Sequence, residues 1–229
     1  MNICVVIPAY NEIANISWLV SSLKKKGYAV LVVDDGSTDD TASAAETAGA
    51  VVLRNDVNMG KGASLIRGFS YVKQKGFDGV IVMDGDGQHL PEDIPVLLRS
   101  AGAGGSLVVG NRMAKPGAMP FSRWLTNKIM SLLLSCLTRQ SIPDSQCGFR
   151  FIAAPLLEKL KLSCSNYEIE SEMLMDAGRS GYKIFSVPVK SVYRGTKSQI
   201  NPVIDTLRFF RFIRRQLRRR SVDDAKRKG

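Results

Sequence analysis

A short apolar strand that ends in two acidic residues constrains this chain more than any other feature. Val80–Met83 is a run of four apolar residues, and Asp84 and Asp86 follow it, separated by Gly85. Such a continuous run is typical of a strand covered on both faces, as in parallel sheets. Two carboxylates this close repel each other unless a cation lies between them, and their oxygens suit Mg²⁺ or Mn²⁺. The stretch indicates a metal site; the alternative is a simple Asp-Gly turn.

Strands and helices alternate along the first 110 residues. This alternation predicts an α/β fold, a three-layer α/β/α sandwich around a mostly parallel central sheet. Right-handed crossovers would place the strand ends at Pro8, Asp35 and Asp84 on one edge of that sheet. The predicted strands are 3–8, 30–33, 51–53, 80–83 and 107–110, and the predicted helices begin near Asn15, at Ser37 or Thr38, near Lys61, and at Pro91 or Glu92.

The positive charge of the chain is concentrated at its end. The 229 residues carry a formal charge of +11, and residues 206–229 hold ten Lys or Arg against two Asp, so that +8 of it lies there. The body is therefore an ordinary globular surface and the tail is the basic element. The four cysteines show no CxxC spacing, which favours reduced thiols over a zinc site or a disulfide framework.

Four strings in the first half of the chain carry a family resemblance: VIPAYNE at 6–12, VVDDGSTD at 32–39, NMGKG at 58–62 and MDGDGQH at 83–89. Together they resemble glycosyltransferase family 2, whose members have the GT-A fold and use nucleotide sugars with a divalent metal. The NMGKG string lacks the GxxxxGK[ST] spacing of a phosphate loop, which makes an ATPase a poor interpretation.

The second half of the chain narrows the resemblance to the dolichol-phosphate mannose synthase branch, which transfers a hexose to a polyprenyl phosphate. The matching strings are GNR at 110–112, DSQCGFR at 144–150, YEIESE at 167–172 and YKIFSVPV at 182–189. The resemblance implies a GT-A domain over 1–200, with a nucleotide-sugar half at 1–112 and an acceptor half at 113–200. Residues 201–229 are expected to form a basic amphipathic helix and tail.

The resemblance also implies a site. The metal, Mg²⁺ or Mn²⁺, would be held by Asp84 and Asp86, with Gln88 completing the shell, and His89 would be a neighbour rather than a base. Arg194 and Lys197 would close over the phosphates from a loop. The implied donor-binding residues are Pro8, Tyr10, Glu12, Val33, Asp35, Lys61, Asp84, Gly85, Asp86, Arg194 and Lys197.

On the acceptor side, Arg112 and Arg123 would grip the phosphate of the lipid. Asp86, Arg112, Arg123 and Asp144 make up the implied catalytic set. Asp144 has three open roles: a general base, as in relatives with alcohol acceptors, a group that orients an arginine or the sugar, or a turn cap. A polyprenyl phosphate is already ionised near neutral pH and needs no base. Glu170 and Glu172 lie on a predicted helix and are either part of the site or solvated.

Two stretches favour contact with a membrane. Phe121–Leu137 is either a core helix or an interfacial helix that lines a lipid groove. Residues 207–220 form an amphipathic pattern, with Phe209, Phe210, Phe212, Ile213 and Leu217 on one face and Arg208, Arg211, Arg214, Arg215 and Arg218 on the other. That pattern is typical of a helix on an anionic membrane surface; the alternative is packing on the body or on a second subunit.

No apolar stretch approaches the roughly 20 residues of a spanning helix, and the chain begins directly with a strand, so we expect no leader peptide. The expected protein is peripheral on the cytoplasmic face of the membrane, with a separate anchoring partner as an open question.

The favoured function is an inverting, metal-dependent hexosyltransferase that uses GDP-mannose and a polyprenyl phosphate. The alternative donor is a UDP-sugar such as UDP-glucose. A sugar-phosphate nucleotidyltransferase is disfavoured because Ala9–Glu12 is not a glycine-rich, basic activation loop. A nucleic-acid-binding module is disfavoured because the body lacks a basic face.

Overall fold

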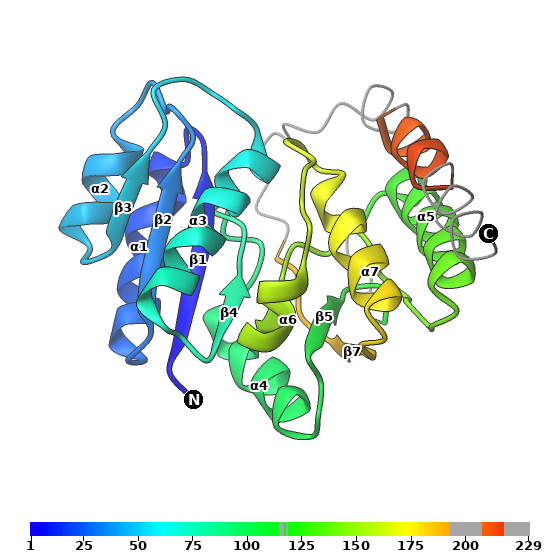
Figure 1. Cartoon of the computed structure of the whole chain (residues 1–229). Helices are drawn as coiled ribbons and strands as arrows, with labels where there is room; N and C mark the ends of the chain where they lie inside the picture. Colours follow the sequence, from blue (N-terminus) through cyan, green and yellow to red (C-terminus); the bar gives the residue numbers. More distant parts are fainter. Residues whose placement is uncertain (115–116, 118, 193–207, 218–229) are drawn as a thin grey trace. The chain divides into compact units, whose positions relative to one another are not determined.

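One mixed sheet organises the residues that the computed structural model describes, which are 1–114, 117, 119–192 and 208–217. Its seven strands lie in the order β3-β2-β1-β4-β6-β5-β7 (Figure 1). All neighbouring pairs are parallel except those that β6 makes with β4 and β5. The strands are β1 (Ile3–Ala9), β2 (Ala29–Asp34), β3 (Val51–Arg54), β4 (Gly79–Val82), β5 (Leu107–Asn111), β6 (Arg150–Ala153) and β7 (Ile184–Pro188). The predicted mostly parallel α/β fold is confirmed.

Helices cover both faces of this sheet. α1 and α2 pack against each other, and α3 packs on β1 and β2 (Figure 1). Because the chain crosses from β3 back over β2 and β1 to β4, right-handed crossovers put α3 on the face opposite α1 and α2. The helices are α1 (Ile13–Lys25), α2 (Thr41–Thr47), α3 (Lys61–Lys75), α4 (Ile94–Gly102) after the 3₁₀ turn η1 (Pro91–Asp93), α5 (Phe121–Thr138), α6 (Ala154–Lys159) and α7 (Ile169–Arg179).

The predicted start of α2 at Ser37 or Thr38 is wrong, because both residues serve a turn that joins the ends of β1 and β2. The Asn11 N–H donates to Ser37 Oγ at 2.9 Å, and the Thr38 N–H donates to Asn11 Oδ1 at 2.8 Å. The helix begins at Thr41, whose N–H donates to Asp39 Oδ1 at 3.0 Å. This arrangement fixes the Ala9–Glu12 turn beside the end of β2.

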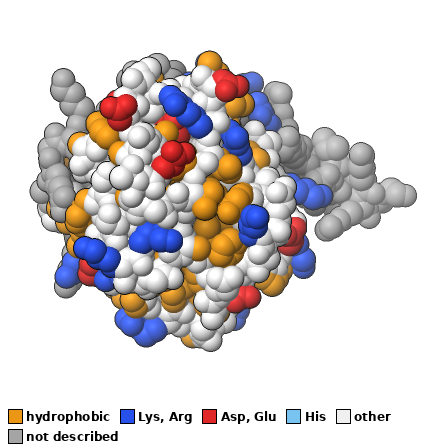
Figure 2. Space-filling model, turned by 90° about the vertical axis from the view of Figure 1, so that its left-hand side faces the viewer, with side chains coloured by type: hydrophobic (Ala, Val, Ile, Leu, Met, Phe, Trp, Pro, Cys, Tyr) orange, Lys and Arg blue, Asp and Glu red, His pale blue; other side chains and the backbone are white. Residues whose placement is uncertain are grey.

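The core lies on both sides of β1, β2 and β4, whose apolar side chains are almost completely buried. Gly68 lets α3 approach this core closely, because a Cβ there would come within 2.7 Å of Val6 Cγ1 and 3.3 Å of Val33 Cγ2. On the side shown in Figure 2, apolar side chains gather near the middle with Lys, Arg, Asp and Glu side chains around them. Tight packing in the interior sets the positions of the strand ends.

The N-terminus of α3 is sealed by another part of the chain. The N–H groups of Gly62 and Ala63 both donate to Ser165 O, at 2.8 and 3.2 Å. A side chain at Gly62 would overlap the backbone carbonyl of Cys164. A backbone oxygen of the protein therefore satisfies these helix N–H groups. Glycine is needed at 62 because the backbone of Cys164 lies so close, and not because a phosphate binds there. This agrees with the rejection of an ATPase.

The chain forms two compact units, Met1–Gly195 and Thr196–Gly229. In the second unit the structure describes residues 208–217, which are helical. Of the five apolar residues predicted for its membrane face, Phe209, Phe212 and Ile213 are buried, whereas Phe210 and Leu217 are 52% and 46% exposed. The predicted helix is present at these residues, and three of the five side chains predicted for its membrane face are buried. Arg218 and the rest of the predicted tail lie outside the described residues.

Within the described ranges, none of the helices is both long enough and apolar enough to cross a bilayer.

We predict that Gly62→Ala destabilises the protein by roughly 1–3 kcal/mol, because the new methyl group meets backbone that cannot turn away. The matched control is Gly102→Ala at the end of α4, where a Cβ meets nothing within 4 Å. That change should be neutral or slightly stabilising, by no more than about 1 kcal/mol. Urea unfolding of both variants is the measurement, and equal stability of the two would contradict this account of α3.

Candidate active site

Three carboxylates meet where β1 and β4 end. Asp84 and Asp86 follow β4, and Gly85 between them lies against the Ala9–Glu12 turn, since an added Cβ would be 3.3 Å from Glu12 Cγ and 3.4 Å from Pro8 O. Burial, and then the charges of Asp86 and Asp84, raise the pKa of Glu12 to about 7. Burial and the charge of Asp84 likewise raise the pKa of Asp86. Burial and mutual repulsion thus disfavour the ionised forms of Glu12 and Asp86 unless a cation offsets their charge.

A divalent cation would relieve this repulsion, and oxygen donors of this kind suit Mg²⁺ or Mn²⁺. Among the described residues, no group of three or more His, Cys, Asp or Glu side chains is arranged to hold a metal by itself. The donor set thus fits a metal that takes a few ligands from protein and the rest from a bound diphosphate. Gln88 is fixed by its backbone: its N–H donates to Asp86 Oδ1 at 2.9 Å, and its carbonyl accepts from the Val192 N–H at 2.9 Å.

Lys61 is the first residue of α3, and its ammonium joins two halves of the site. Its Nζ lies 2.6 Å from Asp84 Oδ1 and 2.6 Å from Glu170 Oε1. Burial alone would raise the pKa of Asp84, but the Lys61 charge, with a smaller contribution from Arg112, holds it below its usual range. Because Glu170 belongs to α7, Lys61 connects the start of α3 and the end of β4 to α7.

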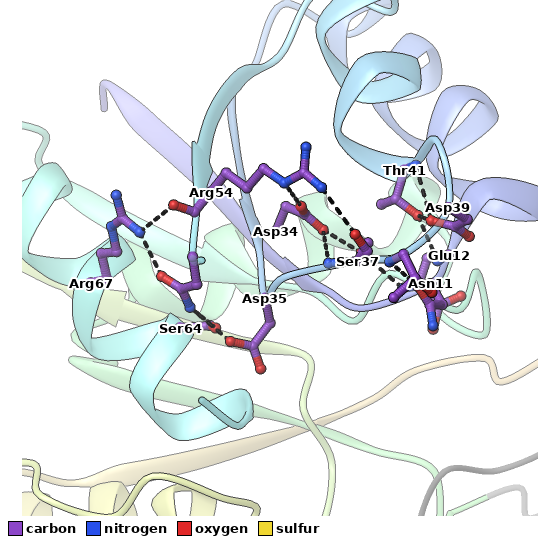
Figure 3. Close-up of polar contacts among 12 residues, drawn as sticks. Asn11, Glu12, Asp34, Asp35, Ser37, Asp39, Thr41, Arg54, Ser64 and Arg67 are labelled. Atoms are coloured by element: carbon purple, nitrogen blue, oxygen red, sulfur yellow. Dashed lines mark hydrogen bonds and ion pairs between the residues drawn. The ribbon is translucent and has the colours of Figure 1, made fainter. Parts of the chain in front are cut away.

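Asp34 and Asp35 point to different partners (Figure 3). Asp34 accepts hydrogen bonds from the N–H and hydroxyl of Ser37, and it lies 3.2 Å from Arg54 Nε. Asp35 accepts from Asn55 Nδ2 at 2.7 Å and from the N–H groups of Met59 and Gly60 at 2.9 and 2.8 Å. Asp35 therefore anchors the loop that leads into Lys61.

The predicted donor-binding residues differ in whether they are exposed at the site, buried in the protein or outside the described residues. Pro8 and Tyr10 are partly exposed at the end of β1, next to Glu12 and Gly85. Val33 is completely buried against Gly68, so its side chain is part of the core and does not face a base. Asp35 is 4% exposed and its carboxylate is occupied by the loop, so a direct contact with ribose is not favoured. Arg194 and Lys197 lie outside the described residues.

Arg112, which directly follows β5, forms a buried ion pair with Asp144. The N–H and Nε of Arg112 donate to Asp144 Oδ2 at 3.0 and 2.9 Å, and its Nη2 donates to Oδ1 at 3.0 Å. Asn127 of α5 adds a hydrogen bond to Oδ1 at 2.8 Å. Burial alone would raise the pKa of Asp144, but Arg112 holds it below its usual range. Of the three open roles, this geometry favours a group that orients an arginine.

Arg123 lies in the first turn of α5, near enough for its charge to lower the pKa of Asp86 against the larger effects of burial and Asp84. Arg112 acts in the same way on the pKa of Asp84. The structure thus brings the two predicted arginines and the two predicted metal-binding carboxylates to the same region of the sheet edge.

His89 is buried and stacks on Phe149, with 5.2 Å between the ring centres. Burial lowers its pKa to about 4, so the ring is neutral near pH 7. A neutral, stacked imidazole agrees with the interpretation of His89 as a neighbour of the metal motif.

Several residues of the site were not singled out from the sequence. Gly148 lies directly against Asp84, because an added Cβ would overlap that carboxylate. Arg150 is buried and donates to the backbone carbonyls of Cys147, Ser145 and Glu170. Both belong to the Asp144–Arg150 string, which was the only signal for them.

The acidic residues left open on α7 are buried, and solvation is therefore excluded. Glu170 is 5% exposed and binds Lys61. Glu172 is 1% exposed and accepts hydrogen bonds from the N–H groups of Ser163 and Cys164, both at 2.9 Å. Glu172 thus holds residues 163–165, which include the Ser165 carbonyl that caps the start of α3, so its role is to support the site.

Comparison with known proteins agrees with this geometry. Residues 4–161 match the model of the family "Glycosyl transferase family 2". The chain is 31% identical over 207 residues to the undecaprenyl-phosphate mannosyltransferase of Micrococcus luteus, with 85% of each chain covered. It is 29% identical over 228 residues to the UDP-N-acetylglucosamine–dolichyl-phosphate N-acetylglucosaminyltransferase of Methanococcus voltae, with 86% of this chain and 91% of that one covered.

Among solved structures, the chain is similar to glucosyl-3-phosphoglycerate synthase of Mycobacterium tuberculosis in complex with Mn²⁺, UDP and phosphoglyceric acid. The TM-score is 0.70 with 25% identity, over 92% of this chain and 75% of that one. The chain belongs to glycosyl transferase family 2, with the GT-A fold, and is a glycosyltransferase.

We predict that Asp144→Ala costs about 3–5 kcal/mol of stability, because it leaves the buried Arg112 charge without its partner. Arg112→Met should cost a similar amount, and the double variant should cost clearly less than the two together. Guanidinium unfolding of the three variants measures this coupling. The control is Glu158→Ala in the exposed pair with Lys73, at 3.8 Å, which should change stability by about 0.5 kcal/mol or less. Additive costs for Asp144 and Arg112 would contradict the ion-pair account.

Proposed function

We propose that this glycosyltransferase moves a hexose from a nucleotide sugar, with inversion, onto the phosphate of a polyprenyl phosphate. The observation that carries the proposal is the pairing of Asp144 with Arg112. An alcohol acceptor needs a base to take its proton, and Asp144 is committed to an arginine with its pKa lowered. A phosphate acceptor is already ionised and attacks without a base. The names of the relatives from Micrococcus luteus and Methanococcus voltae support the same acceptor class.

In this proposal the carboxylates hold the metal that serves the donor diphosphate, and the arginines bind the acceptor phosphate. Asp84 and Asp86 would hold a divalent cation, which when bound would offset the charge of the donor diphosphate. Arg112 and Arg123 bind and orient the acceptor phosphate, and Asn127 and Asp144 keep Arg112 in place. Lys61 balances Asp84 and Glu170, so that Asp84 stays ionised. Arg194 and Lys197 remain proposed phosphate contacts of the donor.

For the donor we propose GDP-mannose, with a UDP-sugar as the second candidate. The name of the Micrococcus luteus relative supports a mannosyl donor. The Methanococcus voltae relative and the Mycobacterium tuberculosis structure, which contains UDP, support the second candidate. Pro8, Tyr10 and Glu12 are the residues at the proposed base position that would distinguish the two.

We further propose that the protein works as a peripheral protein on the cytoplasmic face of an anionic membrane, where a lipid acceptor resides. The arginines of the tail support this, since each basic residue near an anionic surface contributes about 1 kcal/mol. Arg211, Arg214 and Arg215 are exposed on the described helix. Phe210 and Leu217 are the described apolar residues left to insert into lipid. A separate anchoring partner is compatible with this arrangement.

We predict that one nucleotide sugar stabilises the protein against heat only when Mn²⁺ or Mg²⁺ is present. A ligand that binds the folded state raises the melting temperature, by an amount that corresponds to about 2.7 kcal/mol at 100 times its Kd. The measurement is a thermal-shift panel of GDP-mannose, UDP-glucose and UDP-N-acetylglucosamine, with each metal and with EDTA.

Asp86→Asn is the test variant of that panel, because it removes one proposed metal ligand while keeping the shape of the side chain. It should lose the metal-dependent shift and retain a cooperative transition. Asp56→Asn, an exposed carboxylate outside the site, is the control and should behave like the wild type. A full shift with Asp86→Asn, or with EDTA in the wild type, would contradict the proposed metal site.

A further inference from the structure

The Lys61 ammonium is paired with an oxygen of the proposed metal ligand Asp84. Lys61 Nζ lies 2.6 Å from Asp84 Oδ1, and the two side chains are 14% and 26% exposed. The Asp84 carboxylate is also confined by Gly148, because a Cβ added there would overlap it. Asp84 therefore already has a cation of the protein itself against one of its oxygens.

Lys61 has further partners that do not depend on Asp84. Its Nζ lies 2.6 Å from Glu170 Oε1 and 5.6 Å from the centre of the Tyr167 ring. Glu170 belongs to α7, and Tyr167 lies just before the start of that helix. The ammonium can therefore give up Asp84 and still have a carboxylate and an aromatic face beside it.

A divalent cation on Asp84 and the Lys61 ammonium would repel each other. A lysine ammonium is charged near neutral pH, and carboxylates beside it favour that state. Like charges a few ångströms apart repel strongly in a partly buried place. A metal ion that arrives alone would therefore meet a carboxylate whose charge is already offset. A nucleotide diphosphate would bring the negative charge that both cations need.

We propose that Lys61 makes metal binding conditional on the donor: without a nucleotide its ammonium disfavours Mn²⁺ or Mg²⁺ at Asp84, and the diphosphate of the donor removes this penalty. The inference rests on the proposed metal-dependent function and goes beyond Lys61 as a donor contact. In it Lys61 is a positioning residue, because it acts on the metal through Asp84. By linkage, the nucleotide raises the affinity for the metal by the same factor as the metal raises the affinity for the nucleotide.

The test is a Mn²⁺ titration of the full chain, without nucleotide and with GDP or UDP, followed by the electron paramagnetic resonance signal of the free ion. A titration of each nucleotide without protein corrects for the Mn²⁺ that the nucleotide binds. The wild type should bind Mn²⁺ about tenfold or more tightly when one of the two nucleotides is present. Lys61→Met should bind Mn²⁺ without nucleotide about tenfold or more tightly than the wild type, because the ion no longer meets the ammonium. The effect of the nucleotide should shrink by a similar factor in this variant.

Lys73→Met is the matched control, because it removes an ammonium from the same helix, in the exposed pair with Glu158. It should bind Mn²⁺ like the wild type. Adding Lys61→Met to Asp84→Asn should give no gain in Mn²⁺ affinity, since the gain needs a freed Asp84 carboxylate. Lys61→Gln repeats the test with a polar side chain, and cooperative thermal unfolding shows that each variant has folded.

The inference is overturned if folded Lys61→Met and Lys61→Gln bind Mn²⁺ without nucleotide no more tightly than the wild type, as a merely structural role of Lys61 would require. It is also overturned if Lys73→Met shows the same gain, or if the wild type binds Mn²⁺ equally tightly with and without nucleotide, which needs no variant. These outcomes leave the proposed function standing as long as the wild type binds Mn²⁺ together with a nucleotide. Absence of Mn²⁺ binding to the wild type with either nucleotide contradicts the proposed metal site, and this inference with it.

Discussion

The Lys61 ammonium between Asp84 and Glu170 is the contact on which the rest of the site depends. Without it, Asp84 would lose the largest of the charges that hold its pKa low, beside Asp86 and Glu12, whose pKa values burial and neighbouring carboxylates already raise. Lys61 reaches this position because Asp35 holds the preceding loop and because Ser165 O seals the start of α3. A charge balance set by one lysine thus joins α3, the end of β4 and α7.

The second ion pair decides which chemistry the site favours. Arg112 and Asp144 satisfy each other through three hydrogen bonds, so Asp144 is held ionised and is not poised to take a proton. The arginine, in turn, is held at a fixed place from which it can meet an anion. Such a site suits an acceptor that brings its own negative charge. Helix α5 holds Asp144 through the buried Asn127, and it exposes Phe121 and Leu132, which suits a lipid as the carrier of that charge.

Much of the fold could be predicted from local patterns. Apolar runs indicate strands and helices, and acidic residues directly after a strand indicate the edge of the sheet where a site lies. β4 with Asp84 and Asp86, and α5 over 121–138, followed from such runs. The antiparallel direction of β6 could not be predicted, since a run of four residues at 150–153 carries no sign of its direction. Glu170 and Gly148 contact Lys61 and Asp84, more than fifty positions away, and Val33 and Asp35 are buried by partners on α3 and the loop before it. Such long-range contacts leave no pattern in a single sequence.

The central claim is that the acceptor is a lipid phosphate that needs no general base. It is tested most directly by giving the purified full chain, with its stabilising donor and Mn²⁺ or Mg²⁺, three acceptors in detergent: polyprenyl phosphate, the neutral polyprenol, and 3-phosphoglycerate. Mass spectrometry of the products would show which one receives the hexose. The account predicts transfer to polyprenyl phosphate and at most traces on polyprenol. Comparable transfer to polyprenol, or transfer to 3-phosphoglycerate alone, would contradict it.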